Sequence, residues 1–447
     1  MIRTIEVSGF RSLENFRLDL IPGLNVLVGA NGSGKTNIIA FLGFVSQLAS
    51  KGLSTAISSY GGSGSVFRKV GRVEYESRLQ GKITGYVPCP EASDDESESF
   101  KKNLLYTYAF EIALSEDRES VYFVSQNLKL AYVSKATKSA SKKNIVWGAE
   151  VSQKVNRDGE WEVSFNGLDP VFKEEGTRWS NKEIVTIIKD RTAEDRPLLL
   201  AAIDLTPGPY GAPLLEDFRR GLVFNPHPRA IRKQEDSAKL PGVNPDGSGL
   251  SASLFALKRK KNKQTSLAVR RATPQTDFPF STVIGLPRLI EYFQLAYPDL
   301  QELDVKNDTF QNIIQVRVTI AGPDKTQVPL AALSDGTLKW MSFVTAILTN
   351  RRVLAIEEPE NYVHPTVQRE AIRIIRNHIG DKRSVIVSTH SETVINSVKP
   401  NELIIVCTED GRTNAKRIKH PKTVIDQINK TGFGLAFYLN SGALEDA

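Results

Sequence analysis

Gly29-Ala-Asn-Gly-Ser-Gly-Lys-Thr36 follows the apolar segment Asn25–Val28 and leads into helical periodicity that runs from Lys35 to about Leu48. The spacing matches G-x-x-x-x-G-K-[ST], a loop between a strand and a helix. Glycines let the backbone wrap closely around phosphates, so that successive N–H groups and the helix N-terminus face the anion. The stretch therefore predicts a phosphate-binding loop.

The loop also predicts which residues bind the nucleotide. Lys35 would reach the β- and γ-phosphates, and the hydroxyl of Thr36 would hold Mg²⁺. The predicted nucleotide ligands within the loop are Asn31, Gly32, Ser33, Gly34, Lys35 and Thr36. ATP and Mg²⁺ are the expected cofactors.

A second motif, Val353-Leu-Ala-Ile-Glu-Glu-Pro-Glu360, joins an apolar strand to paired carboxylates. A parallel strand that ends this way places acid at the carboxyl edge of a sheet, beside the phosphate loop. One carboxylate organises the metal while the next activates water. We therefore predict Glu357 as the metal-side residue and Glu358 as the catalytic one.

Two further motifs gain weight from their positions. Leu333-Ser-Asp-Gly-Thr337 opens a helix, and Ser334 precedes Glu357 by 23 residues. Taken alone this motif predicts only a helix cap. His390 follows an apolar strand, Ser384–Ser388, and comes 32 residues after Glu358. A histidine at a strand tip beside a phosphate site is a candidate catalytic residue.

Periodicity predicts an α/β fold. After residue 313, strands alternate with helices, which favours a mostly parallel sheet covered on both faces. Residues 104–133 read as antiparallel strands around a charged turn. The expected division is 1–180 for the first part of the head with an antiparallel lobe, 181–300 for an inserted, mainly helical region, and 301–447 for the rest of the head. Sustained heptads are absent, so no long coiled coil is expected.

Together the four motifs resemble the ABC-type ATPases of the SMC/RecF/OLD branch, close to the "AAA family" ATPases of bacterial defence systems. The resemblance implies head-to-tail pairing into a dimer, with larger rings known among relatives. ATP would lie between one subunit's phosphate loop and the other's signature, where Ser334 and Gly336 contact the γ-phosphate. His390 would steady the transition state.

The chain departs from the family pattern at two positions and leaves a third open. Asp335 stands where transporters have glycine, and Glu357 stands where aspartate is usual. Gln47 and Gln80 are both candidates for the family's glutamine loop.

The absent parts narrow the resemblance. OLD nucleases carry a Toprim domain after the ATPase, and the 57 residues after His390 are too few for one. SMC coiled coils are missing. The remaining likeness is to the ATPase subunits of Septu- and PARIS-type anti-phage systems, which implies a regulatory ATPase that controls a separate effector, often a nuclease. A RecF-like repair ATPase acting on DNA is the alternative, and a nucleotide-dependent scaffold is a third.

Composition sets the remaining limits. Of 447 residues, 40% are hydrophobic and 24% charged, which is typical of a globular protein. No apolar run approaches the roughly 18 residues that span a bilayer, and two cysteines cannot build a disulfide framework, so a cytoplasmic protein without a membrane partner is expected. The net charge is +7, and residues 250–276 hold seven Lys or Arg and no acid. DNA, an acidic partner or solvent could face this segment.

Overall fold

The computed structural model describes residues 1–72, 74–87, 102–117, 119–134, 145–155, 160–168, 185–186, 188–189, 196–201, 211–219, 222–261, 285–349, 353–361, 363–379 and 384–444. The acidic run at 91–98 and the basic segment beyond residue 261 lie outside the described residues. Most of the helix expected at 181–189 does so as well.

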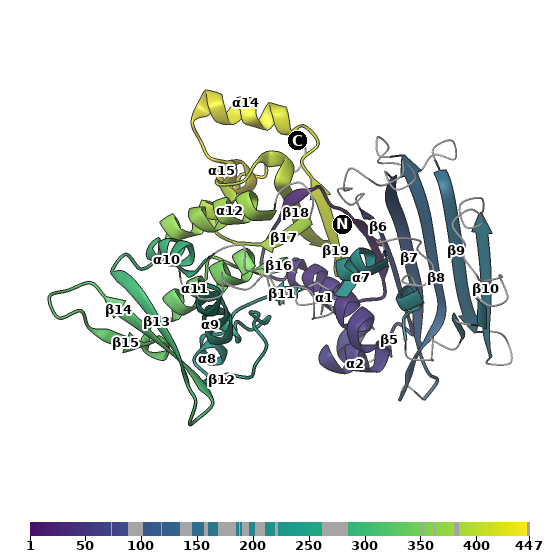
Figure 1. Cartoon of the computed structure of the whole chain (residues 1–447). Helices are drawn as coiled ribbons and strands as arrows, with labels where there is room; N and C mark the ends of the chain where they lie inside the picture. The colour runs from purple at the N-terminus through teal and green to yellow at the C-terminus, as the bar shows by residue number, and fades with distance from the viewer. Residues whose placement is uncertain are drawn as a thin grey trace.

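A six-stranded sheet forms the centre of the molecule (Figure 1). Its order is β11 (Leu222–Phe224), β16 (Val353–Glu357), β17 (Ser384–Ser388), β3 (Gly23–Val28), β18 (Leu403–Glu409) and β19 (Arg412–Arg417). The first five strands are parallel, and β19 closes one edge as the antiparallel partner of β18. The predicted mostly parallel sheet is confirmed.

Alternation along these strands sends side chains into two separate cores. Leu27, Ala355 and Ile386 belong to one core, with α1 (Lys35–Lys51) and the large antiparallel sheet. Val26 and Val385 belong to the other, with α11 (Asp335–Thr349) and α12 (Pro365–Ile379). Coverage on both faces explains why these strands are apolar almost throughout.

The antiparallel lobe is a seven-stranded sheet on the right of Figure 1, and it too is as predicted. Its order is β10 (Trp161–Leu168), β9 (Ile145–Val155), β8 (Val121–Ser134), β7 (Lys102–Leu114), β6 (Arg78–Val87), β1 (Ile2–Ser8) and β2 (Phe16–Asp19). The short helices α2 (Leu53–Ser59) and α3 (Ser63–Val66), the hairpin β4 (Lys69–Val70) and β5 (Glu74–Tyr75), and α7 (Gly211–Arg219) complete this half of the molecule.

A small antiparallel sheet on the left of Figure 1 differs from expectation. The strand predicted at 313–320 is β14 (Ile313–Ile320), but it pairs with β13 (Leu300–Asp308), β12 (Glu235–Asp236) and β15 (Gln327–Pro329) instead of joining the parallel sheet. Periodicity identifies a strand without naming its partners. Around it lie α8 (Pro228–Ile231), α9 (Leu250–Lys261) and α10 (Leu286–Gln294).

The last elements are α13 (Glu392–Ile395), α14 (Pro421–Thr431) and α15 (Leu435–Asn440). The longest helix among the described residues, α1, has 17 residues. The three-part division of the chain stays a prediction. The central sheet takes β3, β11 and the remaining strands from different parts of the sequence.

Candidate nucleotide-binding site

The glycine-rich loop leaves the end of β3 and enters α1 as predicted from the sequence. Gly29 and Gly34 both have left-handed backbones, with φ of 152° and 101°. A Cβ at Gly29 would overlap the carbonyl of Val406, and one at Gly34 would overlap the side chain of Thr413. No side chain caps the start of α1. Its first N–H groups therefore remain available to an anion.

Lys35 lies inside the loop that it is predicted to serve. Its Nζ donates to the carbonyl of Gly29 at 2.8 Å and to that of Ala30 at 2.9 Å. The residue is only 6% exposed, and burial lowers the pKa of its amine, opposed by the charges of Glu358 and Glu360. The ammonium is thus held at the place where a phosphate would lie.

Residues from the two ends of the chain brace the loop, which the sequence did not reveal. Thr408 donates to the carbonyl of Gly32 at 3.3 Å. Thr413 is fully buried, and its hydroxyl lies 2.6 Å from that of Ser12, which also accepts from Asn37 at 2.7 Å. The β18–β19 hairpin therefore fixes the loop from outside.

The acidic strand ends level with the loop. Glu357 pairs in register with Ser388 of β17, and Ser388 pairs with Leu27 of β3. Asn225, just past the end of β11, donates to Glu357 Oε2 at 3.0 Å. Burial is the main cause that raises the pKa of Glu357, and the neighbouring Glu358 adds to it, while the bond from Asn225 opposes both.

Oxygen ligands suited to Mg²⁺ are available at this edge of the sheet. Thr36 is exposed, and its hydroxyl is free to turn toward a ligand at the loop. A hydroxyl and a carboxylate are the hard donors that Mg²⁺ prefers, and this ion usually keeps several waters. Among the described residues no group of three or more His, Cys, Asp or Glu is arranged for a metal. The set fits a metal that arrives with the nucleotide.

Glu358 has an unusual backbone and several partners. Its φ is 43°, in the region that favours glycine, and its N–H donates to the carbonyl of Ser388 at 3.0 Å. The carboxylate accepts from Asn361 at 2.7 Å, and its Oε1 lies 3.7 Å from Nε2 of His390. Strained backbone is concentrated at functional sites. The predicted catalytic pair, Glu358 and His390, is thus brought together.

Glu360 orders the segment that carries the histidine. Its Oε1 accepts from the hydroxyl of Thr389 and from the backbone N–H of His390, both at 2.7 Å. Its Oε2 is buried and has no hydrogen-bond partner among the described residues. The sequence placed Glu360 in the acidic motif but gave it no role. Its contacts make it a positioning residue for His390.

The signature motif begins α11, as predicted. Ser334 caps the helix, with its Oγ accepting from the N–H of Thr337 at 3.2 Å. Ser334 is exposed, and Gly336 is partly so. Among the described residues, no hydrogen bond joins either one to the phosphate loop of the same chain. This placement leaves both groups available to another molecule.

Arg232, which the sequence did not single out, holds the backbone that leads into the signature. Its Nε donates to the carbonyl of Ala331 at 3.0 Å, and a terminal nitrogen donates to that of Leu333 at 2.9 Å. The other terminal nitrogen lies 2.6 Å from Asp335. A guanidinium suits this forked contact because its donors are fixed in one plane.

Neither glutamine-loop candidate lies at the site. Gln47 is in the C-terminal half of α1, where its Oε1 is buried without a hydrogen-bond partner among the described residues. Gln80 is on the outer face of β6. Asn225 supplies the side-chain amide beside Glu357. A search restricted to glutamine misses it, although its position after the apolar strand Leu222–Phe224 was a usable signal.

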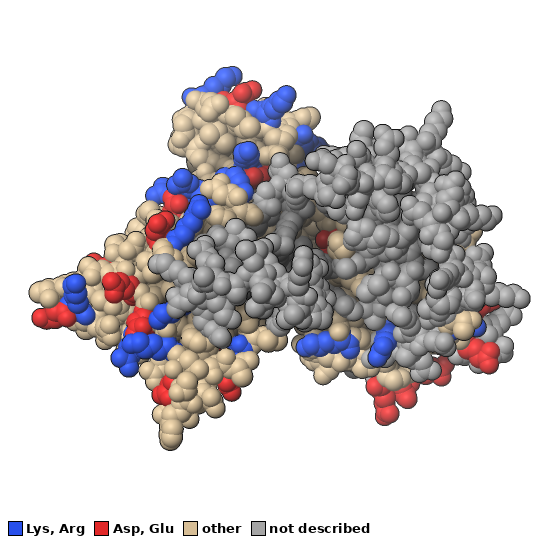
Figure 2. Space-filling model, viewed as in Figure 1, with Lys and Arg blue, Asp and Glu red and all other residues tan. Residues whose placement is uncertain are grey.

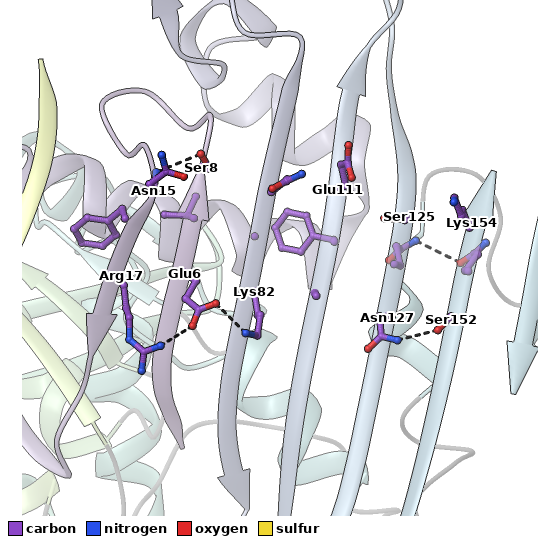
Figure 3. A pocket seen from close by; sticks show the side chains of 18 residues that line it. Glu6, Ser8, Asn15, Arg17, Lys82, Glu111, Ser125, Asn127, Ser152 and Lys154 are labelled. Carbon is purple, nitrogen blue, oxygen red and sulfur yellow. Dashed lines mark hydrogen bonds and ion pairs between the residues drawn. The ribbon is translucent and has the colours of Figure 1, made fainter. Parts of the chain in front are cut away.

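The largest cavity lies elsewhere, on the polar face of the seven-stranded sheet (Figure 3). It has a volume of about 650 Å³. Its charges are paired across the strands, since Glu6 contacts both Arg17 and Lys82. The surface is therefore nearly neutral and separate from the phosphate loop.

Two family models match this chain. Residues 1–195 match "AAA ATPase domain", and residues 175–396 match "AAA domain, putative AbiEii toxin, Type IV TA system". Among curated proteins, the "DNA replication and repair protein RecF" of Rhodococcus erythropolis is 44% identical over 54 residues, 12% of this chain and 13% of that protein. The protein of the same name from Heliobacterium modesticaldum is 42% identical over 45 residues, 10% and 12% of the two chains. The chain thus matches less than a fifth of either relative.

Solved structures with a similar chain course include an SMC head bound to the C-winged helix domain of ScpA, with 16% identity and a TM-score of 0.43. The SMC head domain from Thermotoga maritima has 11% identity and a TM-score of 0.38. Each alignment covers 94% of this chain and 99% of the other. With its two ATPase-domain matches and its RecF relatives, the chain is an ATPase of SMC/RecF-like type. No helix among the described residues is long and apolar enough to cross a membrane.

Proposed function

We propose that this chain hydrolyses ATP at a site shared between two copies, with the phosphate loop of one copy facing the signature of the other. The observation that carries the proposal is the meeting of Lys35, Glu357 and the Glu358–His390 pair at one edge of the central sheet. Ligands bind at this edge in open α/β sheets.

The geometry supports a division of roles among these residues. Lys35 would exchange its two loop carbonyls for phosphate oxygens, and its charge would offset theirs. Thr36 and Glu357 would hold Mg²⁺, with Asn225 orienting the Glu357 carboxylate. The ion neutralises phosphate charge when it is bound. Glu358 would accept a proton from the attacking water, and His390 would lie beside the reacting phosphate.

Ser334 and Gly336 would complete the site from the partner copy. Both lie at the exposed start of α11, where N–H groups and the serine hydroxyl point outward from a helix N-terminus. The proposal predicts complementation. Ser334→Arg and Lys35→Ala proteins should each be inactive, and mixing them should restore part of the activity, because one composite site then has an intact loop and an intact signature.

The mixing experiment needs proof that hybrids form. Differently tagged chains, captured through one tag and detected through the other, provide it. No recovered turnover at any mixing ratio, with hybrids present, would contradict a shared site.

For the biological role we propose the regulatory ATPase of a defence complex that controls a separate effector, as in the Septu- and PARIS-type systems that the motifs resemble. Co-purification with the product of a neighbouring gene, dependent on ATP, tests this role. An isolated chain that forms no complex with any neighbouring product would count against it.

A RecF-like role on DNA is the second candidate, favoured by the curated relatives, which are named for DNA replication and repair. Lys258, the first residue of the predicted basic segment, donates to the carbonyl of Val305 at 2.7 Å and lies 3.4 Å from Asp304. It is therefore engaged within the protein. Salt-dependent binding of duplex DNA by the isolated chain would favour this second role.

A further inference from the structure

A groove lies on the small antiparallel sheet, next to the signature but outside the nucleotide site. It runs between residues 231–234, which follow α8, and the edge of β14, and it has a volume of about 450 Å³. The turn Leu330–Ala332, which leads into the signature, forms one end. Its size falls within the range of ligand sites in proteins.

The charge of the groove has one sign. Arg232, Lys233 and Arg317 line it, and among the described lining residues there is no Asp or Glu. Arg232 is paired with Asp335 outside the groove. Within the part of the chain that the structure describes, neither Lys233 nor Arg317 has a carboxylate at ion-pair distance. The groove thus presents cations that lack anionic partners of their own.

The walls also suit a peptide. Three glutamines, Gln234, Gln315 and Gln327, add side-chain amides that both donate and accept hydrogen bonds. On this edge of β14, β12 pairs with residues 313–314 and β15 pairs with residues 317–319. The intervening pair, Gln315 and Val316, has no strand partner on this edge among the described residues. An extended peptide can pair with a strand edge of this kind.

One lining residue connects the groove to the signature. Arg232 contacts the carbonyls of Ala331 and Leu333, immediately before Ser334. An anion that draws the Arg232 guanidinium into the groove would compete with these contacts and with Asp335. Occupancy of the groove would therefore change how firmly the signature is held.

We propose that this groove binds an acidic peptide segment of a partner protein and that its occupancy regulates ATP turnover through Arg232. A short extended peptide accounts for the cations, the amides and the uncovered strand edge together. Duplex DNA fits less well, because duplex binding of useful affinity neutralises several phosphates over a wide surface. On the face shown in Figure 2, blue and red side chains are interspersed over the described lobes.

The binding step is tested without nucleotide, so that it stands apart from the proposed function on which the regulatory step rests. A library of octapeptides, with two fixed glutamates and randomised neighbours, is selected on the full chain beside a library with two fixed lysines. We expect enrichment from the glutamate library alone. Selected peptides should bind Lys233→Glu/Arg317→Glu protein at least tenfold more weakly.

A matched control reverses two exposed lysines elsewhere. Lys419→Glu/Lys422→Glu changes net charge by the same amount beside α14 and should leave peptide affinity within about twofold. No enrichment of acidic peptides would overturn the proposal. Equal loss in the control would overturn it too, since the effect would then be one of overall charge. A fluorescein-labelled 20-base-pair duplex that binds the wild type and displaces the peptides would assign the groove to nucleic acid instead.

The regulatory step has its own readout. A saturating selected peptide should change the ATP turnover of the wild type at least twofold. The Lys233→Glu/Arg317→Glu protein should keep basal turnover and lose the response. Peptide binding without any change in wild-type turnover would refute the link to the signature. If no variant or wild type hydrolyses ATP at all, the proposed function fails while the binding result stands.

Discussion

Replacing Arg232 with methionine removes the side chain that holds the start of the signature while keeping its aliphatic length. Two guanidinium hydrogen bonds to backbone carbonyls are lost, at 2.9 and 3.0 Å, together with the contact to Asp335. Hydrogen bonds to charged groups contribute about 1.5–3 kcal/mol when buried. The Arg232 side chain is 33% exposed, which places each bond near or below the low end of that range.

The ion pair adds little, because Asp335 is 51% exposed and pairs of this kind contribute about 0–1 kcal/mol. The three contacts together then order the signature by about 2–3 kcal/mol. If that order is needed in the transition state, turnover falls roughly 30- to 150-fold, since each 1.36 kcal/mol corresponds to a factor of ten.

Steady-state ATP turnover and equilibrium binding of a fluorescent ATP analogue, measured on the same preparations, test this reasoning. Turnover should fall while nucleotide affinity stays within about twofold, because the phosphate loop is on the other side of the chain's own fold from Arg232's contacts. Arg232→Lys should recover only part of the activity, since an ammonium cannot reproduce the forked contact. Wild-type turnover in a folded Arg232→Met protein would refute it.

Three further results are expected at the loop and the acidic strand. Gly34→Ala should lower both thermal stability and ATP affinity, because alanine is strained at a φ of 101° and its Cβ meets Thr413; Thr413→Ala should relieve only the second effect, as a melting curve would show. Lys35→Ala should weaken ATP binding in titrations with the fluorescent analogue, through loss of a phosphate contact. Since burial raises the pKa of Glu357 above its ordinary value, its contribution to stability is present below that ordinary value and is lost as pH rises through the folded pKa. Melting temperatures between pH 4 and pH 7 should therefore fall less steeply for Glu357→Gln than for the wild type, and parallel curves would contradict the raised pKa.

Local pattern predicted most of the parts that depend on neighbours in sequence. The helix expected at 335–349 is α11, and the strand expected at 384–388 is β17, with the same bounds. Apolar side chains at both faces mark a buried parallel strand, and glycines with a terminal lysine mark the loop. Such signals lie within a few residues of one another, so no tertiary knowledge is needed to use them.

Contacts between distant segments could not be predicted in this way. Asn225 meets Glu357 across 132 residues, and Ser12 meets Thr413 across 401. Arg232 follows a four-residue helix in a stretch rich in proline and glycine, where periodicity carries little information. Its role follows only from the fold, which places it against residues about 100 positions later. The residues that position the catalytic groups are therefore less visible than the groups themselves.

The Glu358→Gln protein provides the most direct test of ATP hydrolysis at this site. Glutamine keeps the size of the side chain and its contact with Asn361 but cannot take a proton from water. We predict that ATP binding is retained, that turnover falls by about 10²- to 10⁴-fold, and that the protein accumulates as an ATP-bound assembly larger than one chain, measured by light scattering during gel filtration. Turnover near that of the wild type would contradict the assignment of Glu358 as the general base.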